Sequence, residues 1–395
     1  MAIAGDPIQM AAIEGKGRAL VSARSLRAGE IVLKESPILI YSALPFVPGK
    51  YRASYCYNCF RIIANHQTTT TCGSSSSHVF CNPNCLSIAL ASSHPPWVCQ
   101  ALSRLQDHPS FNSQNEEVQI QAKFLIAAYN LAIRSPAEFQ ILLSLQGEAR
   151  DCSSMQEVEF LHSIVTSFCP NVVQLTGSGL ELTALLLAKD KLNAFGLMES
   201  FVGERSVRGY GLYPKASFFN HDCLPNVCRF DYLDNGCGVG NTDIVIRVIH
   251  DVPRGRELCL SYFPVNERYA VRQKRLLEDY GFRCVCDRCK VESAWSDDEG
   301  EDGEMEEEEA GDEAMEDDDN VDVGEQDDEQ MDADENGGCN DFPHAYFFLR
   351  YMCDKENCGG TLAPLPPSGD GHCSNVMECN VCGNLKPDDQ TGSSS

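Results

Sequence analysis

Cysteines recur in this sequence at the spacings of metal ligands. The segment FRCVCDRC (282–289) places Cys284, Cys286 and Cys289 close enough to offer three thiolates to one ion. A structural zinc site is tetrahedral, so it needs a fourth ligand from elsewhere in the chain. The 21 cysteines include Cys-x2-Cys pairs, a pattern that favours zinc over disulfides and fits an intracellular protein whose thiols are mostly reduced.

Two other regions offer complete ligand sets. Residues 51–100 carry cysteines among Ser, Thr, Pro and Asn with few apolar runs, so metal must replace a hydrophobic core there. Residues 339–385 resemble a zinc ribbon, because glycines follow two of the cysteines and permit tight turns. The two sets are Cys56, Cys59, Cys81 and Cys85, and Cys353, Cys358, Cys379 and Cys382.

A further set, interleaved with the first of these, is incomplete. Cys72, His94 and Cys99 fit a second zinc site, but Ser75 stands where the fourth ligand is expected. A serine hydroxyl is a poor zinc ligand. Either His78 replaces it or this site is empty, and the sequence leaves both alternatives open.

Four motifs follow one another along the chain: GKGR (15–18), NHDCLPN (220–226), GRELCLSY (255–262) and FRCVCDRC (282–289). In this order they resemble the SET domain and its post-SET extension. The cysteine-rich block between the first two resembles a MYND finger. The chain is therefore similar to SMYD-type protein lysine methyltransferases, and especially to their plant branch of ASH-related histone-lysine methyltransferases.

The resemblance implies S-adenosylmethionine as cofactor. Lys16, Gly17 and Arg18 match the segment that meets its methionine end, where glycine permits close backbone approach and the cations can pair with a carboxylate. Asn220 and His221 match the pair that holds the adenine and ribose side, and this pair also braces the fold. An ordinary surface turn is the alternative for GKGR.

Tyr262 matches the tyrosine that lies beside the transferring methyl group. Methyl transfer to a lysine amine depends on alignment and electrostatics, and the amine must be neutral. The resemblance places Phe282 against adenine and Tyr280 on the lysine channel. It adds Asn193 to the cofactor pocket and Phe195 to the channel. A buried structural tyrosine is the alternative for Tyr262.

The same resemblance completes the post-SET zinc site with Cys223 from NHDCLPN. The metal would then pin the post-SET loop against the cofactor segment. Asp222 stands where the family usually has Ser, which leaves the side-chain contact at that position open.

Short strands must position these motifs. Alternation predicts a strand pair over 19–23 and 30–35, joined by a turn at Gly29. IVIRVI (244–249) and ELCLSY (257–262) are the clearest later strands.

A helical insert separates the two groups of strands. Apolar residues at helical spacing predict helices over 117–145 and 180–191, with a capping-box start at Ser135, Pro136 and Glu138. The predicted fold class is α+β: a SET-type fold of small sheets with a pseudoknot, interrupted by the MYND-like finger and the helices.

These signals divide the chain into seven parts. They are the SET N-terminal part (1–50), the MYND-type finger (51–100), the helical insert (101–190), the SET catalytic C-terminal part (191–263), the post-SET zinc segment (264–292), an acidic disordered linker (293–338) and a cysteine-rich tail (339–395).

Charge narrows the choice of partners. The net charge is −27, but 24 of the 58 acidic residues lie between 297 and 335, leaving 34 acids against 31 bases elsewhere. Direct nucleic-acid binding is not expected, since it needs basic patches. A basic, lysine-bearing protein tail such as that of a histone would be attracted. No segment reaches the length of a membrane span. We expect a monomer whose main location is the nucleus and whose second location is the cytoplasm.

Three functions compete. The leading one is transfer of methyl groups to protein lysines, plausibly on histones. A catalytically silent zinc-finger adaptor is the second, and the presence of Tyr262 with Asn220, His221 and the GKGR segment argues against it. Histone binding through the acidic run alone is the third, and it leaves the cofactor motifs unexplained.

Overall fold

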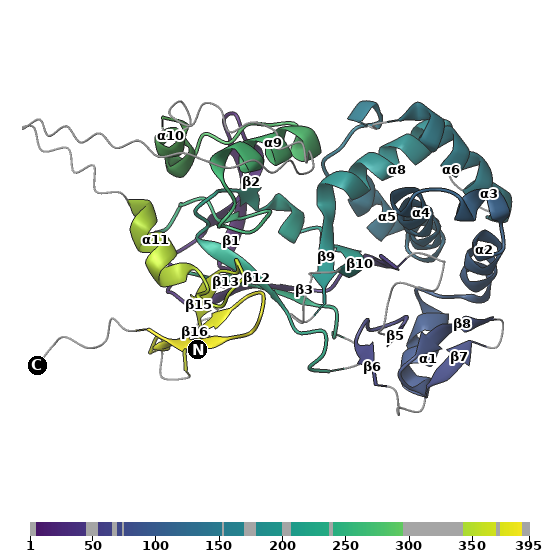
Figure 1. Cartoon of the computed structure of the whole chain (residues 1–395), viewed down its shortest axis with the longest axis horizontal. Coiled ribbons are helices and arrows are strands. Elements are labelled where there is room, and N and C mark those ends of the chain that lie inside the picture. The colour runs from purple at the N-terminus through teal and green to yellow at the C-terminus, as the bar shows by residue number, and fades with distance from the viewer. Residues whose placement is uncertain are drawn as a thin grey trace, which may run out of the picture.

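The computed structural model describes residues 5–44, 54–64, 69–72, 75–151, 154–169, 179–199, 207–236, 240–294, 343–368 and 372–388. A lobe of small sheets and a lobe of helices lie side by side, with strands β9 and β10 between them (Figure 1). This mixture confirms the predicted α+β fold class. The acidic linker falls outside the described residues except for residues 293 and 294.

The sheet lobe contains two three-stranded sheets, β4-β10-β9 and β12-β13-β3, a hairpin of β1 and β2, and a parallel pair of β11 and β14. Its core packs branched apolar side chains such as Leu26, Ile246 and Val248. The strands are β1 (Ile8–Ile13), β2 (Gly17–Ser22), β3 (Ile31–Glu35), β4 (Leu39–Ser42), β9 (Ala194–Met198), β10 (Val207–Leu212), β11 (Asn220–His221), β12 (Val227–Asp231), β13 (Ile244–Val248) and β14 (Cys259–Leu260).

One predicted pairing is wrong. Strands β2 and β3 both exist, but β2 pairs with β1 and β3 pairs with β13. The connection between them is not a tight hairpin turn, because the amide of Leu26 donates to Val252 and that of Gly29 donates to Val248. The chain between β2 and β3 therefore runs along the segment that follows β13.

The helical lobe is built around α4. Asn115 caps this helix by accepting from the amide of Val118 at 2.9 Å, and two acidic residues occupy its first turn. Helix α5 starts at Pro136 as predicted, although Ser135 makes no side-chain capping bond. The elements are α2 (Pro96–Gln106), α3 (Pro109–Asn112), α4 (Glu116–Arg134), α5 (Pro136–Leu143), η1 (Ala149–Asp151), α6 (Met155–Phe168) and α8 (Leu180–Asn193).

The cysteine-rich block, residues 54–99, is attached to the sheet lobe by hydrogen bonds between its backbone and an ion pair of that lobe. Arg208 of β10 is 1% exposed and binds both carboxylate oxygens of Asp234 at 2.9 Å. The same guanidinium donates to the carbonyl of Phe60. The block's elements are β5 (Ser54–Tyr55), β6 (Ile62–Ile63), β7 (Thr70–Cys72), β8 (Ser75–Phe80) and α1 (Pro83–Ala91).

The C-terminal tail, residues 343–368 and 372–388, packs on the sheet β12-β13-β3. Arg247 of β13 is 1% exposed, donates to Glu378 at 2.6 Å and lies over the ring of Phe230 at 3.6 Å. A buried cation needs such a partner, so this pair fixes where the tail docks. The elements that follow β14 are α9 (Tyr269–Tyr280), α10 (Asp287–Ser293), α11 (Pro343–Tyr351), β15 (Leu362–Pro364), β16 (Val376–Cys379) and β17 (Leu385–Pro387).

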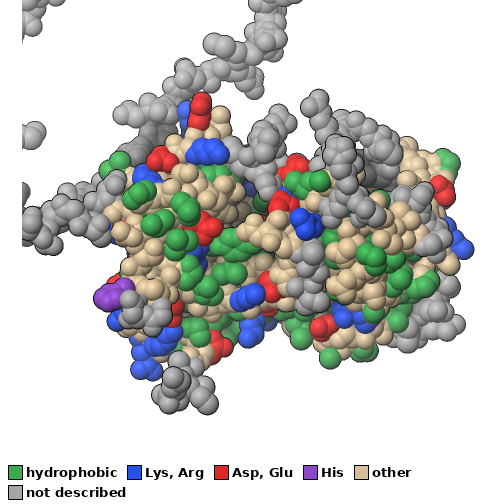
Figure 2. Space-filling model, turned by 90° about the horizontal axis from the view of Figure 1, so that it is seen from below, with side chains coloured by type: hydrophobic (Ala, Val, Ile, Leu, Met, Phe, Trp, Pro, Cys, Tyr) green, Lys and Arg blue, Asp and Glu red, His purple; other side chains and the backbone are tan. Residues whose placement is uncertain are grey.

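Within the described ranges, no helix combines the length and the apolar character needed to cross a bilayer. On the face shown in Figure 2, hydrophobic side chains are interspersed with side chains of both charges.

Gly209 is a sensitive point of the contact between the cysteine-rich block and β10. A Cβ atom at this position would lie 2.5 Å from the buried ring of Phe60. We expect Gly209→Ala to lower the free energy of unfolding by about 1–3 kcal/mol, measured by denaturant titration. The matched control is Gly196→Ala on neighbouring β9, where the nearest atoms lie at 3.5 Å. Equal stability of the two variants would contradict this tight contact.

Candidate active site and metal centres

A cavity of about 760 Å³ collects most of the predicted cofactor residues. Its walls come from the turn between β1 and β2, the end of α8, the segment around β11, and the chain that follows α9. The predicted residues that line it are Lys16, Gly17, Arg18, Asn193, Asn220, His221, Tyr262, Tyr280 and Phe282. The roles assigned to them stay predictions.

The turn at Gly15 to Gly17 owes its shape to glycine. Both glycines have φ near +75°, a conformation that residues with a Cβ rarely adopt. An atom added at Gly17 would meet nothing within 4 Å. The backbone is therefore open to a ligand at this point, as the predicted role of the segment requires.

Glu257 joins two of the predicted cofactor residues, and sequence reasoning missed it. One carboxylate oxygen binds the ammonium of Lys16 at 2.6 Å, and the other accepts from the side-chain amide nitrogen, Nδ2, of Asn220 at 2.9 Å. Burial opposes the charge of Lys16, but the hydrogen bond and charge of Glu257 outweigh it and raise the pKa of Lys16. This ammonium already has an anionic partner.

Arg18 differs from Lys16 in this respect. Its guanidinium donates to the carbonyl of Ser144 at 3.0 Å and lies over the ring of Phe218 at 4.7 Å. Among the described residues it forms no ion pair. Arg18 is therefore the cation of the GKGR segment that is free to form an ion pair with the carboxylate of a ligand.

His221 and Tyr262 are bonded to each other. The backbone amide of Tyr262 donates to Nδ1 of His221 at 3.1 Å, and the Tyr262 hydroxyl donates to the carbonyl of Phe219 at 3.0 Å. Burial lowers the pKa of His221 to about 3, so the ring is neutral, and burial raises the pKa of Tyr262, so its hydroxyl stays protonated.

Aromatic rings form one wall of the cavity. The ring of Tyr280 lies 4.8 Å from that of Tyr262 and 6.5 Å from that of Phe282. Phe195 is not among the lining residues. It packs instead against Tyr213, with ring centroids 5.7 Å apart, and under the guanidinium of Arg229.

Asn193 reaches the cavity from the end of α8, but its amide nitrogen is already used. Nδ2 donates to the carbonyls of Gln146 and Lys189, both at 2.8 Å. Gln146 and Lys191 also line the cavity, and the sequence offered no motif that would have found them.

The post-SET cysteines gather as expected. The Sγ atoms of Cys223, Cys284, Cys286 and Cys289 all lie within 4.8 Å of one another. Cys223 is 4.0 Å from Cys284 and 3.5 Å from Cys289, near the ~3.8 Å expected between thiolates around a tetrahedral zinc ion with bonds of ~2.3 Å. The donor set therefore fits zinc.

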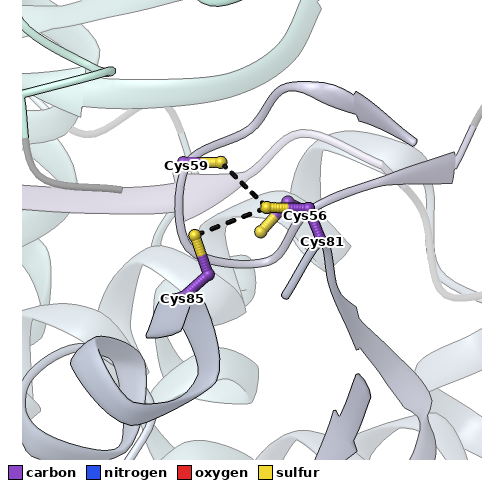
Figure 3. Close-up of side chains that lie close together, drawn as sticks. All are labelled: Cys56, Cys59, Cys81 and Cys85. Carbon is purple, nitrogen blue, oxygen red and sulfur yellow. Dashed lines mark hydrogen bonds between the residues drawn. The ribbon is translucent and has the colours of Figure 1, made fainter. Parts of the chain in front are cut away.

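The cysteine-rich block carries two ligand sets. In the first, Sγ of Cys81 lies 3.8 Å from that of Cys59 and 3.5 Å from that of Cys85, and Cys56 points to the same centre (Figure 3). Four buried thiols around one point fit a structural zinc ion.

The second set contains His78, which favours the first of the two alternatives left open above. Sγ of Cys99 lies 3.1 Å from that of Cys72 and 3.6 Å from Nδ1 of His78, and His94 completes the group. Burial lowers the pKa of His78 to about 3 and that of His94 to about 4, so both imidazoles are neutral, as metal ligands must be. Within the described chain, neither buried ring nitrogen of His94 has a hydrogen-bond partner.

The tail carries the fourth cluster. Cys353 lies 3.7 Å from Cys382, and Cys358 lies 3.6 Å from Cys379, measured between Sγ atoms. Four groups of cysteine and histidine side chains can thus hold zinc, and each contains the ligands predicted for it, with His78 added to the second set of the cysteine-rich block.

Comparison with known proteins identifies the family. The SET domain model matches residues 17–263, which is more than half of the chain. The chain belongs to the SET domain family. It is 54% identical to the histone-lysine N-methyltransferase ASHR2 of Arabidopsis thaliana, over 97% of this chain and 96% of that protein.

Two more distant relatives are also similar to this chain. The histone-lysine N-methyltransferase ASHR1 of Arabidopsis thaliana is 24% identical, over 69% of this chain and 53% of that protein. A SET and MYND domain-containing protein of Dictyostelium discoideum is 33% identical, over 28% of this chain and 20% of that protein.

The second set of the cysteine-rich block predicts a specific metal stoichiometry. We expect the purified chain to hold four zinc ions and His78→Ala to hold three, because a site with three ligands binds structural zinc far more weakly. Elemental mass spectrometry gives the count. Ser75→Ala is the control and should keep all four ions. A fourth ion retained in His78→Ala would show that His78 is not a ligand.

Proposed function

We propose that the chain is a protein-lysine N-methyltransferase that moves a methyl group from S-adenosylmethionine to the ε-amine of lysine. The observation that carries this proposal is the cavity in which the GKGR turn, Asn220 and His221 meet Tyr262. The 54% identity to a histone-lysine N-methyltransferase over nearly the whole chain supports it. A catalytically silent adaptor does not require a cavity in which these motifs meet, so the cavity favours the enzyme.

The residues of the cavity fit the parts of the cofactor. Arg18 can pair with its carboxylate, the open backbone at Gly17 permits close approach, and the exposed ring of Phe282 can pack against adenine. When bound, S-adenosylmethionine supplies a methyl group on a positively charged sulfur. The protein then has to hold a neutral amine in line with that methyl group.

Tyr262 and Tyr280 can perform this positioning. Their rings lie close together, and burial raises the pKa of both hydroxyls, so neither becomes an anion. Removal of the lysine amine from water at this wall disfavours its charged form and thereby helps the lysine lose its proton. The Tyr262 hydroxyl, held by the carbonyl of Phe219, fixes the ring against the reacting amine.

The proposed substrate is a basic histone tail, and the proposed location is the nucleus. The excess of acidic residues in the chain would raise the local concentration of a basic partner at low ionic strength. The monomeric state and the lack of direct nucleic-acid binding remain expectations from charge and resemblance.

Methyl transfer tests the proposal. We expect the full chain to transfer labelled methyl from S-adenosylmethionine to histones, and Tyr262→Phe to reduce the rate by about 10²-fold, because the ring loses its anchor at Phe219. Tyr269→Phe, at a half-buried tyrosine that does not line the cavity, is the control. No transfer by the wild-type chain to any histone would contradict the histone substrate, and an unchanged rate in Tyr262→Phe would contradict the role of Tyr262.

The two cations of the GKGR segment should differ in cofactor binding. Arg18→Gln should weaken binding of S-adenosylmethionine by about tenfold or more, since a charge-assisted hydrogen bond to a carboxylate is lost. Lys16→Gln should change it less, because Lys16 is already paired with Glu257. Calorimetric titration of both variants with S-adenosylmethionine measures the two affinities. The reverse ranking would show that the ligand displaces Glu257.

A further inference from the structure

We infer that Arg272 and Gln273 of helix α9 are positioning residues: their N–H groups hold the thiolates of the post-SET metal centre and thereby couple metal binding to the wall of the cavity. The metal part of this inference stands on the geometry of the four-cysteine cluster. The cavity part rests on the proposed function.

Arg272 is entirely buried beside the cluster. Its Nε donates to Sγ of Cys223 at 3.3 Å, and its Nη2 lies 3.8 Å from Sγ of Cys289. The other face of the guanidinium is fixed by the carbonyl of Glu267 at 2.6 Å and the carboxylate of Glu292 at 2.5 Å. Every nitrogen of the side chain therefore has a partner, so the group is oriented as well as charged.

Charge explains why a guanidinium lies there. Four thiolates around a divalent ion carry two net negative charges, and burying them without compensation is unfavourable. Arg272 supplies a positive charge with donors fixed in a plane, which a lysine ammonium could not reproduce at all of these partners.

Gln273 holds the same cluster through a neutral amide. Its Nε2 donates to Sγ of Cys289 at 3.2 Å and to the carbonyl of Cys284 at 2.9 Å. Its Oε1 accepts from the amide of Cys284 at 3.1 Å. The side chain thus binds the metal-ligand loop at a backbone position and at a thiolate.

Both residues connect the metal to the cavity. Helix α9 ends at Tyr280, and Phe282 follows two residues later, so the helix that carries Arg272 and Gln273 leads directly into two of the aromatic residues that line the cavity. On the opposite side of the cluster, Nε2 of His221 lies 3.2 Å from Sγ of Cys223.

His221 links the cluster to Tyr262. Because the amide of Tyr262 donates to Nδ1, a neutral His221 ring carries its proton on Nε2 and donates it to Cys223. The thiolate of Cys223 therefore accepts hydrogen bonds from Arg272 of α9 and from His221, which in turn accepts from the backbone amide of Tyr262.

Hydrogen bonds to a metal-bound thiolate strengthen metal binding and lower the reactivity of the sulfur toward electrophiles. Groups that orient metal ligands in this way typically change metal affinity by about 10–100-fold when they are removed. Removing the Arg272 or Gln273 donors should therefore make the thiolates of the post-SET cluster more reactive and leave the other three clusters unchanged.

Site-resolved alkylation of the zinc-loaded full chain tests the metal part. N-ethylmaleimide labelling is followed by peptide mass spectrometry for Arg272→Gln, Gln273→Glu and the control Lys274→Gln, whose side chain is exposed. We expect Cys223, Cys284, Cys286 and Cys289 to react about 10–100-fold faster in the first two variants, with the other three clusters and the control unchanged.

Gln273→Glu keeps the size of the side chain and the acceptor for Cys284, so it separates loss of the donors from loss of the fold. Wild-type labelling rates in both variants would overturn the inference. Equal acceleration of all four clusters in both variants would also overturn it, since that result indicates general unfolding.

Binding of S-adenosylhomocysteine, measured by calorimetry, tests the coupling to the cavity. Affinity should fall several-fold in Arg272→Gln and Gln273→Glu and stay unchanged in Lys274→Gln. Unchanged affinity in variants whose cluster has become reactive would overturn the coupling. If the wild-type chain binds none, the proposed function fails, while the alkylation result still decides the metal part.

Discussion

The cluster of Cys223, Cys284, Cys286 and Cys289 is the constraint on which the cavity depends. One ligand comes from the segment after β11 and three come from the segment after α9, about 60 residues later in the chain. These two segments carry Asn220 and His221 on one side and Tyr280 and Phe282 on the other. An ion at this point fixes two walls of the cavity against each other, and no large apolar core is needed to do so.

The charged residues of the cavity have different roles. Glu257 binds Lys16 and Asn220 and so stabilises the turn and β11 as one unit, while Arg18 remains available for an anionic ligand. The cysteine-rich block and the C-terminal tail contribute no residue to the cavity lining among the described residues. The block is held by hydrogen bonds from its backbone to the Arg208–Asp234 pair of the sheet lobe. The tail is held by the ion pair of Arg247 with Glu378, so both are attached to the sheet lobe.

Much of the site could be predicted because metal ligands and glycine turns leave local signals. Cysteine spacing predicted two complete clusters and three ligands of the post-SET cluster, while Cys223 was supplied by resemblance and the fourth ligand of the second set in the cysteine-rich block was left open. GKGR marked a glycine turn, and both of its glycines have positive φ. Glu257 left no such signal, since its partners lie far away in the sequence. Phe195 was assigned to the substrate channel by resemblance alone; its ring packs against Tyr213, and its role in the channel stays a prediction. The hairpin of β2 and β3 was wrong because alternation identifies strands without identifying their partners.

Calorimetric titration of the zinc-loaded chain with S-adenosylmethionine tests the central claim most directly, with Cys223→Ser as the variant. Cys223 does not line the cavity, so this change reaches the ligand through the metal centre and through His221, which donates to Cys223. The account predicts one molecule bound per wild-type chain and loss of binding in the variant. Equal affinity in both proteins would contradict it.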